Sequence, residues 1–78
     1  MTPKTIIKTK KWKYEVVFST RTTCAIAVLE IILWGVSPEK YSVVNIDDYY
    51  YLLTSNLNVL DIIGESLIPS QYTINTPI

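Results

Sequence analysis

The most apolar run of the chain falls within residues 21–34, which read RTTCAIAVLEIILW. Ser19 and Thr20, just before the run, are residue types that suit a helix N-cap. Gly35, just after it, is the residue type that most often follows the end of a helix. The run is also far longer than a typical strand of about 5–6 residues. We therefore predict a helix over residues 21–34, with Leu29 and Ile32 in the hydrophobic core.

This predicted helix is apolar around nearly its whole circumference, and Glu30 is the main interruption. A helix of this kind needs cover on more than one side. A chain of 78 residues has few elements of its own with which to provide that cover. We therefore expect a sister subunit or a larger partner protein to complete it. The apolar run is too short for the roughly 20 residues that span a bilayer, so a membrane span is not expected. A buried helix is expected, and a helix that lies on a membrane surface is the alternative.

A strand is predicted on the N-terminal side of the helix. From Lys10 to Phe18, aromatic and β-branched residues alternate with mostly charged residues, which is typical of a half-buried strand. We expect one face of this strand to contribute to the core (Trp12, Tyr14, Val16 and Phe18). We expect the other face to contact water (Lys11, Lys13, Glu15 and Val17).

A hairpin and a second helix are predicted on the C-terminal side. Residues 41–46 and 49–54 have strand composition and flank the pair Asp47-Asp48, which suits a turn; a single helix over residues 38–54 is the alternative. Asn56 can cap a helix over residues 57–67, where leucine and isoleucine recur at helical spacing.

The predicted fold is therefore a small α+β domain in the order β-α-β-β-α. Its three-stranded antiparallel sheet is packed by the one long apolar helix. The domain occupies residues 10–68, between a basic extended arm at residues 1–9 and an extended C-terminal tail at residues 69–78.

Charge is distributed unevenly along the chain, although the net charge is zero. Residues 1–21 hold six of the seven basic residues and only one of the seven acidic residues. Lysines bind phosphates and aromatic rings stack on bases, so one interpretation is contact with nucleic acid. The other is a basic arm that lies on the acidic body of the same chain or of a sister subunit. The candidate nucleic-acid contacts are Lys8, Lys10, Lys11, Lys13 and Arg21.

A basic strand, a helix, the link Gly35-Val36-Ser37 and a second helical segment follow one another in an order that resembles ribbon-helix-helix DNA-binding proteins. The corresponding segments are residues 11–18, 21–34 and 38–53. The resemblance implies a dimeric regulator that binds DNA through the basic strand. The sequence departs from it in two ways: the first helix is very apolar, and the second segment is rich in β-branched residues and tyrosine.

The residues that most catalytic and metal sites require are scarce. Cys24 is the only cysteine and the sequence has no histidine, so an intrachain disulfide, histidine-dependent triads and the usual zinc ligand sets are excluded. We expect no enzymatic activity, no cofactor and no metal. The lone cysteine and the lack of a signal-peptide pattern point to a reducing, intracellular and cytoplasmic location.

The sequence DDYYY at residues 47–51 combines acidic and aromatic side chains. Tyrosine is enriched at protein interfaces because it brings a large area and a polar tip with few rotatable bonds. The alternative is that these rings lie over the core of their own domain. We expect a protein-binding module, as an accessory subunit, adaptor or inhibitor of a larger assembly. The expected contact residues are Asp47, Asp48, Tyr49, Tyr50, Tyr51 and Tyr72.

Overall fold

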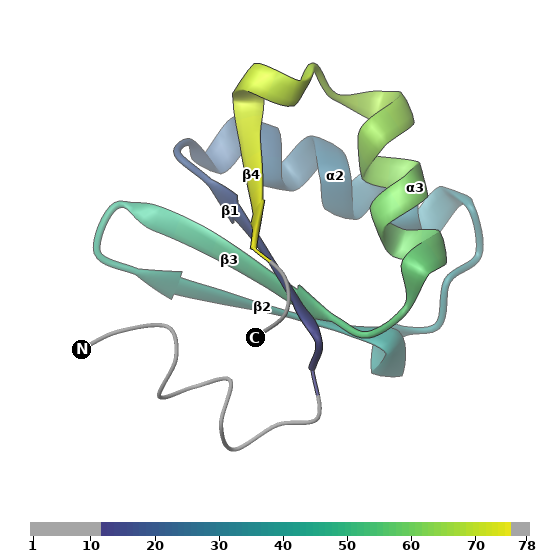
Figure 1. Cartoon of the computed structure of the whole chain (residues 1–78). Coiled ribbons are helices and arrows are strands. Elements are labelled where there is room, and N and C mark those ends of the chain that lie inside the picture. The colour runs from purple at the N-terminus through teal and green to yellow at the C-terminus, as the bar shows by residue number, and fades with distance from the viewer. Residues whose placement is uncertain (1–11, 76–78) are drawn as a thin grey trace.

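The structure, a computed structural model, describes residues 12–75, which form four strands and two α-helices (Figure 1). The α+β class predicted from the sequence is confirmed. The predicted arm, residues 1–9, and the last residues of the predicted tail, 76–78, lie outside the described residues. In chain order the elements are β1 (Tyr14–Phe18), α2 (Arg21–Leu33), the 3-10 turn η1 (Pro38–Lys40), β2 (Tyr41–Ile46), β3 (Tyr49–Thr54), α3 (Leu57–Ser66), the 3-10 turn η2 (Pro69–Gln71) and β4 (Tyr72–Asn75).

The sheet has four strands in the order β2-β3-β1-β4, so the prediction of three strands is wrong. β4 comes from the predicted tail and pairs antiparallel with β1, with Tyr72 opposite Phe18 and Ile74 opposite Val16. The Tyr72 ring also packs on Phe18, with ring centroids 6.3 Å apart. Without β4, one edge of β1 would present unpaired backbone groups. The tail is therefore part of the sheet.

The hairpin predicted over residues 41–54 is confirmed. β2 and β3 pair antiparallel from Tyr41 opposite Thr54 to Ile46 opposite Tyr49, around a turn made by Asp47 and Asp48. Asp47 has a φ of 55°, a left-handed conformation that aspartate tolerates better than most residues. The second helix that a ribbon-helix-helix arrangement would need is therefore replaced by a short 3-10 turn and two strands.

Both α-helices begin at the caps that the sequence indicates. The backbone N–H of Thr23 donates to Thr20 Oγ1 at 3.2 Å, and the backbone N–H of Asn58 donates to Asn56 Oδ1 at 3.0 Å. Gly35 follows α2 with a φ of 79°, a left-handed conformation that favours glycine. These bonds satisfy backbone groups that have no partner within the helix.

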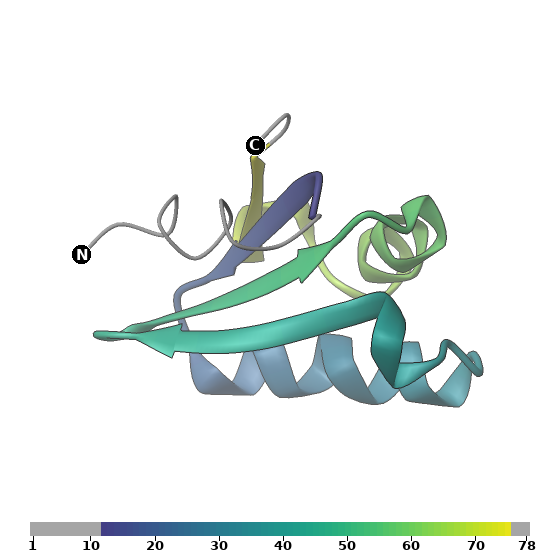
Figure 2. The ribbon, with the colours of Figure 1, turned by 90° about the horizontal axis from the view of Figure 1, so that it is seen from below.

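The hydrophobic core lies between one face of the sheet and the two α-helices (Figure 2). β1 and β3 bring Val16, Phe18 and Leu52, all fully buried. α2 packs on this face and against α3. The two helices contribute Cys24, Ala27, Ile31, Val59, Ile62 and Ile63.

The prediction that Leu29 and Ile32 belong to the core is wrong. Leu29 is 58% exposed and Ile32 is 54% exposed, whereas Ala27 and Ile31 are fully buried. Because α2 is apolar on every side, its spacing could not indicate which side faces the sheet. The residues of α2 that face inward are Cys24, Ala27 and Ile31.

The outward face of β1 also differs from the prediction. Glu15, expected in water, is only 6% exposed, and Asn75 Nδ2 of β4 donates to its Oε1 at 2.6 Å. The burial of this carboxylate depends on the strand β4 that the sequence did not reveal. β1 begins at Tyr14, and Trp12 and Tyr14 are only half-buried.

Candidate protein-interaction surfaces

The outward side of α2 is a line of large apolar side chains that no other described element covers. We name this line the outer stripe; its exposed fractions are 39% at Ile26, 58% at Leu29, 54% at Ile32 and 76% at Leu33. Trp34, directly after the helix, is 59% exposed. Figure 2 shows α2 along one side of the molecule, with its outer side turned away from the sheet and from α3.

The outer stripe follows from helical geometry and from the composition of α2. The charged residues of the helix, Arg21 and Glu30, lie on either side of the stripe at helical spacing, and the stripe itself carries no charge. Single exposed leucines are common on proteins, but contiguous apolar patches mark interaction sites. The sequence indicated that α2 was too apolar to be covered by so small a domain, but not which of its sides would stay open.

The predicted tyrosine set is divided between the two faces of the sheet. Tyr50 lies opposite Phe18 on the helix side and, like Tyr72, packs against the core. Tyr49 and Tyr51 are on the opposite face, because successive side chains of a strand alternate. Tyr49 is 47% exposed and Tyr51 is half-buried.

The face that carries Tyr49 and Tyr51 is largely apolar, and we name it the tyrosine face. In the sheet register, Tyr51 lies opposite Val17 of β1 and Val44 of β2, and Tyr49 lies opposite Ile46. The exposed Asp47 and Asp48 adjoin it at the hairpin turn. The structure therefore keeps Asp47, Asp48, Tyr49 and Tyr51 together, and it separates them from Tyr50 and Tyr72. The face consists of Val17, Val44, Ile46, Tyr49 and Tyr51.

Burial perturbs two titratable groups. The pKa of Tyr51 is raised by burial first, and then by the negative charges of Glu15 and Asp47 and by Tyr49. The pKa of the Cys24 thiol is raised by burial alone. A raised pKa lowers the thiolate fraction, which fits the position of Cys24 in the core, where it is only 5% exposed.

The basic residues predicted to contact nucleic acid do not form a described cluster. Lys13 and Arg21 are both exposed, but they lie at opposite ends of β1. Lys8, Lys10 and Lys11 lie outside the described residues. The two described residues do not form a continuous basic surface.

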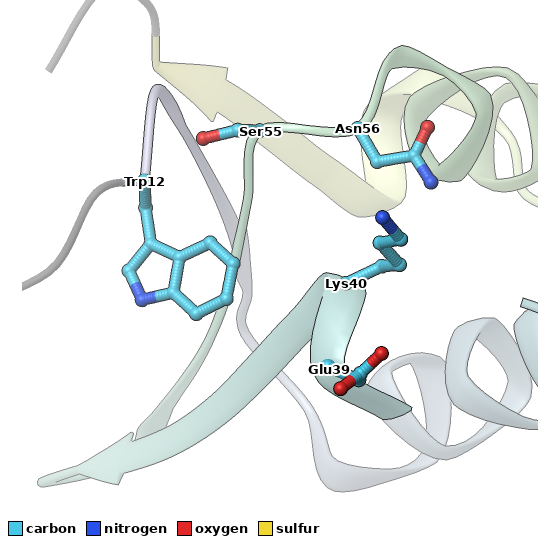
Figure 3. Close-up of a pocket in the computed structure, with 5 residues that line it drawn as sticks. All are labelled: Trp12, Glu39, Lys40, Ser55 and Asn56. Atoms are coloured by element: carbon cyan, nitrogen blue, oxygen red, sulfur yellow. The ribbon is translucent and has the colours of Figure 1, made fainter. Parts of the chain in front are cut away.

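An open pocket of about 520 Å³ lies between the start of β1, the turn η1 and the start of α3 (Figure 3). Two of its polar residues are engaged in local structure: Glu39 Oε1 accepts from the Ser37 hydroxyl at 3.3 Å, and Asn56 caps α3. Trp12 Nε1 is buried without a hydrogen-bond partner among residues 12–75. The residues that line the pocket are Trp12, Glu39, Lys40, Ser55 and Asn56.

Residues 12–75 contain no group of three histidine, cysteine, aspartate or glutamate side chains able to hold a metal ion. Over the same range, neither α-helix has both the length and the apolar character needed to cross a membrane. A comparison of the chain with protein-family models, with curated proteins and with solved structures found no match.

Proposed function

We propose that this chain is a small protein-binding module, without enzymatic activity of its own, that acts as an accessory subunit, adaptor or inhibitor. The observation that carries the proposal is the outer stripe of α2. Leu29, Ile32 and Leu33 are each more than half exposed on one side of a well-capped helix. An apolar surface of this kind is costly in water and is stabilised when another protein covers it.

Burial of the outer stripe would contribute favourably to binding. Complete burial of a leucine or isoleucine side chain contributes about 1.5–3 kcal/mol. Leu29, Ile32 and Leu33 are already partly buried, so each would gain on the order of 1 kcal/mol when covered. Trp34, 59% exposed beside the stripe, adds the residue type most enriched at binding hot spots.

The tyrosine face is the second surface in the proposal. Of the three adjacent tyrosines, only Tyr49 and Tyr51 are expected to serve as aromatic anchors, because Tyr50 packs inward. Asp47 and Asp48 would add negative charge at its edge, which favours a partner with basic side chains. This surface lies on the opposite side of the sheet from α2, so the module could hold two partners at once.

The test compares capture of binding proteins by a tagged chain and by two variants. Leu29→Lys together with Leu33→Lys places charge on the outer stripe, and Leu57→Lys places charge on an equally exposed leucine of α3. We expect the stripe variant to lose a captured protein that the wild type and the Leu57→Lys variant retain. Circular dichroism checks that each variant is folded.

Two results would contradict the proposal. One is capture of the same proteins by all three chains, which would mean that the outer stripe contributes nothing to their capture. The other is capture that disappears after nuclease treatment and weakens steeply with salt, since that behaviour belongs to a complex held by phosphate contacts.

A further inference from the structure

The outward side of α2 has a regular spacing in addition to its apolar character. Thr22, Ala25, Leu29 and Ile32 follow one another at intervals of three, four and three residues, and all four are exposed. Two helices of a coiled coil contact each other along a line of residues with this alternation. We name the line Thr22–Ala25–Leu29–Ile32 the seam. Ile26 and Leu33 lie along one flank of it.

The side chains of the seam increase in size from one end to the other. Thr22 and Ala25 are small, whereas Leu29 and Ile32 are large. A twofold axis perpendicular to α2 at the level of Ala27 brings Thr22 opposite the second copy's Ile32, and Ala25 opposite the second copy's Leu29. Each contact layer then contains one small and one large side chain. The seam is therefore complementary to itself when the two helices run antiparallel.

A parallel arrangement lacks this complementarity. It would place like residues together, with two small side chains at the Thr22 end and two large ones at the Ile32 end. One end would leave a void and the other would hold the helices apart, and both defects are unfavourable in a packed interface.

The flanks of the seam favour the same antiparallel orientation. In antiparallel helices the flank that carries Ile26 and Leu33 meets the same flank of the second copy, so apolar residues contact apolar residues. In parallel helices it would meet the opposite flank, which carries the charged Arg21. Antiparallel pairing keeps the two Arg21 side chains at opposite ends of the interface.

We propose that α2 pairs antiparallel with α2 of a second copy of this chain, about a twofold axis near Ala27. This inference rests on the proposed function, because it names the occupant of the outer stripe. The pairing is isologous, so each copy contributes the same residues and the interface closes at two chains. The tyrosine faces lie on the far side of each sheet from α2, away from this interface. The seam spans only about 15 Å, so the dimer dissociates on dilution.

The test uses disulfide formation between cysteines introduced into the seam, in a Cys24→Ser background that removes the only natural cysteine. The Thr22→Cys and Ile32→Cys chains are oxidised separately and after mixing. A disulfide requires Cα atoms within about 4.4–6.8 Å. In the proposed dimer the two Thr22→Cys positions lie about 15 Å apart along the helix axis, because each is five residues from the twofold axis.

We expect the mixture to form a disulfide about tenfold or more faster than either chain alone, since pairing raises the effective thiol concentration. A mixture of Thr73→Cys with Ile32→Cys is the control, because Thr73 is exposed on β4, away from the seam. It should react no faster than random collision allows. Sedimentation of the wild type should show a dimer that dissociates on dilution, and Leu29→Lys should abolish it.

Rapid disulfide formation by the Thr22→Cys chain alone would indicate parallel helices and overturn the proposal. A wild type that is monomeric at every concentration, or a Leu29→Lys variant that still dimerises, would overturn it too. If the chain is monomeric but the stripe variants lose a captured protein, the outer stripe binds another protein and not a second copy. The dimer proposal then fails, and the proposed protein-binding function stands. If it is monomeric and those variants lose nothing, both proposals fail.

Discussion

Leu29 and Ile31 are two residues apart on α2, yet Ile31 is fully buried and Leu29 is 58% exposed. Ile31 packs among the core residues of the sheet and α3, while Leu29 lies in the middle of the outer stripe. The two side chains are of equal size, so their different burial reflects only their positions on the two sides of the helix. Ile31 stabilises the fold of the single chain, and Leu29 is available for association.

Replacing these two residues should have very different effects on stability. Ile31→Ala should lower the free energy of unfolding by about 2–5 kcal/mol, because it leaves a cavity in the core. Leu29→Ala should cost less than about 1 kcal/mol at concentrations that keep the chain monomeric. Urea denaturation of dilute protein measures both. Equal losses would mean that the assignment of the two sides of α2 is wrong.

The hydrogen bond between Asn75 and Glu15 should hold β4 on the sheet. Asn75→Ala leaves the buried Glu15 carboxylate without its 2.6 Å donor, and an unsatisfied buried polar group costs about 1–3 kcal/mol. We expect faster hydrogen exchange in β4 and little change in the β2–β3 hairpin. Thr73→Ala, at an exposed position of the same strand, is the control. Unchanged exchange in the Asn75→Ala variant would show that strand pairing alone holds β4.

Thr54 should stabilise the junction between β2, β3 and α3. Its fully buried hydroxyl donates to the Lys40 carbonyl at 2.7 Å and accepts from the backbone N–H of Asn56 at 3.0 Å. Thr54→Val keeps the shape and removes both bonds, which should cost about 1–3 kcal/mol in thermal or urea unfolding. Thr54→Ser keeps the hydroxyl and should lose only about 0.8 kcal/mol for the missing methyl group. If Thr54→Ser were less stable than Thr54→Val, this role of the Thr54 hydroxyl would be refuted.

Stability should decline in alkaline solution. Burial raises the pKa of the Cys24 thiol and of the Tyr51 hydroxyl. The unfolded chain therefore releases these protons at a lower pH than the folded chain, and the free energy of unfolding falls as pH rises above about 9. Below that range both groups are protonated in the folded and in the unfolded chain, so their contribution to the free energy of unfolding is fully present. Tyr51→Phe should weaken this pH dependence of the free energy of unfolding, as measured by urea titrations at several pH values. An unchanged pH dependence would mean that Tyr51 does not contribute to it.

Local patterns predicted much of the fold, because their signals lie within short segments. Caps at Thr20 and Asn56, the glycine at position 35 and the alternation around Asp47-Asp48 placed both α-helices and the hairpin within one residue of their observed ends. These features depend on neighbouring backbone groups and not on distant contacts.

Two features depended on contacts between distant segments and were not predicted. β4 joins β1 across most of the chain, and the strand spacing of Tyr72 and Ile74 gives no signal for which strand they pair with. The inward side of α2 carries Cys24, Ala27 and Ile31, whereas hydrophobicity alone favoured Leu29 and Ile32. The division of the tyrosines followed from alternation, but the register was needed to show that Tyr50 faces inward.

The most direct test of the account is an isotope-filtered NOE experiment on a mixture of labelled and unlabelled chains. It detects contacts only between different copies. We predict an NOE between the Ala25 methyl group of one copy and the Leu29 methyl groups of the other, because the twofold axis near Ala27 brings these residues together. A dimeric sample whose intermolecular NOEs come from Tyr49 and Tyr51, with none from the outer stripe, would contradict the central claim that α2 is the association surface.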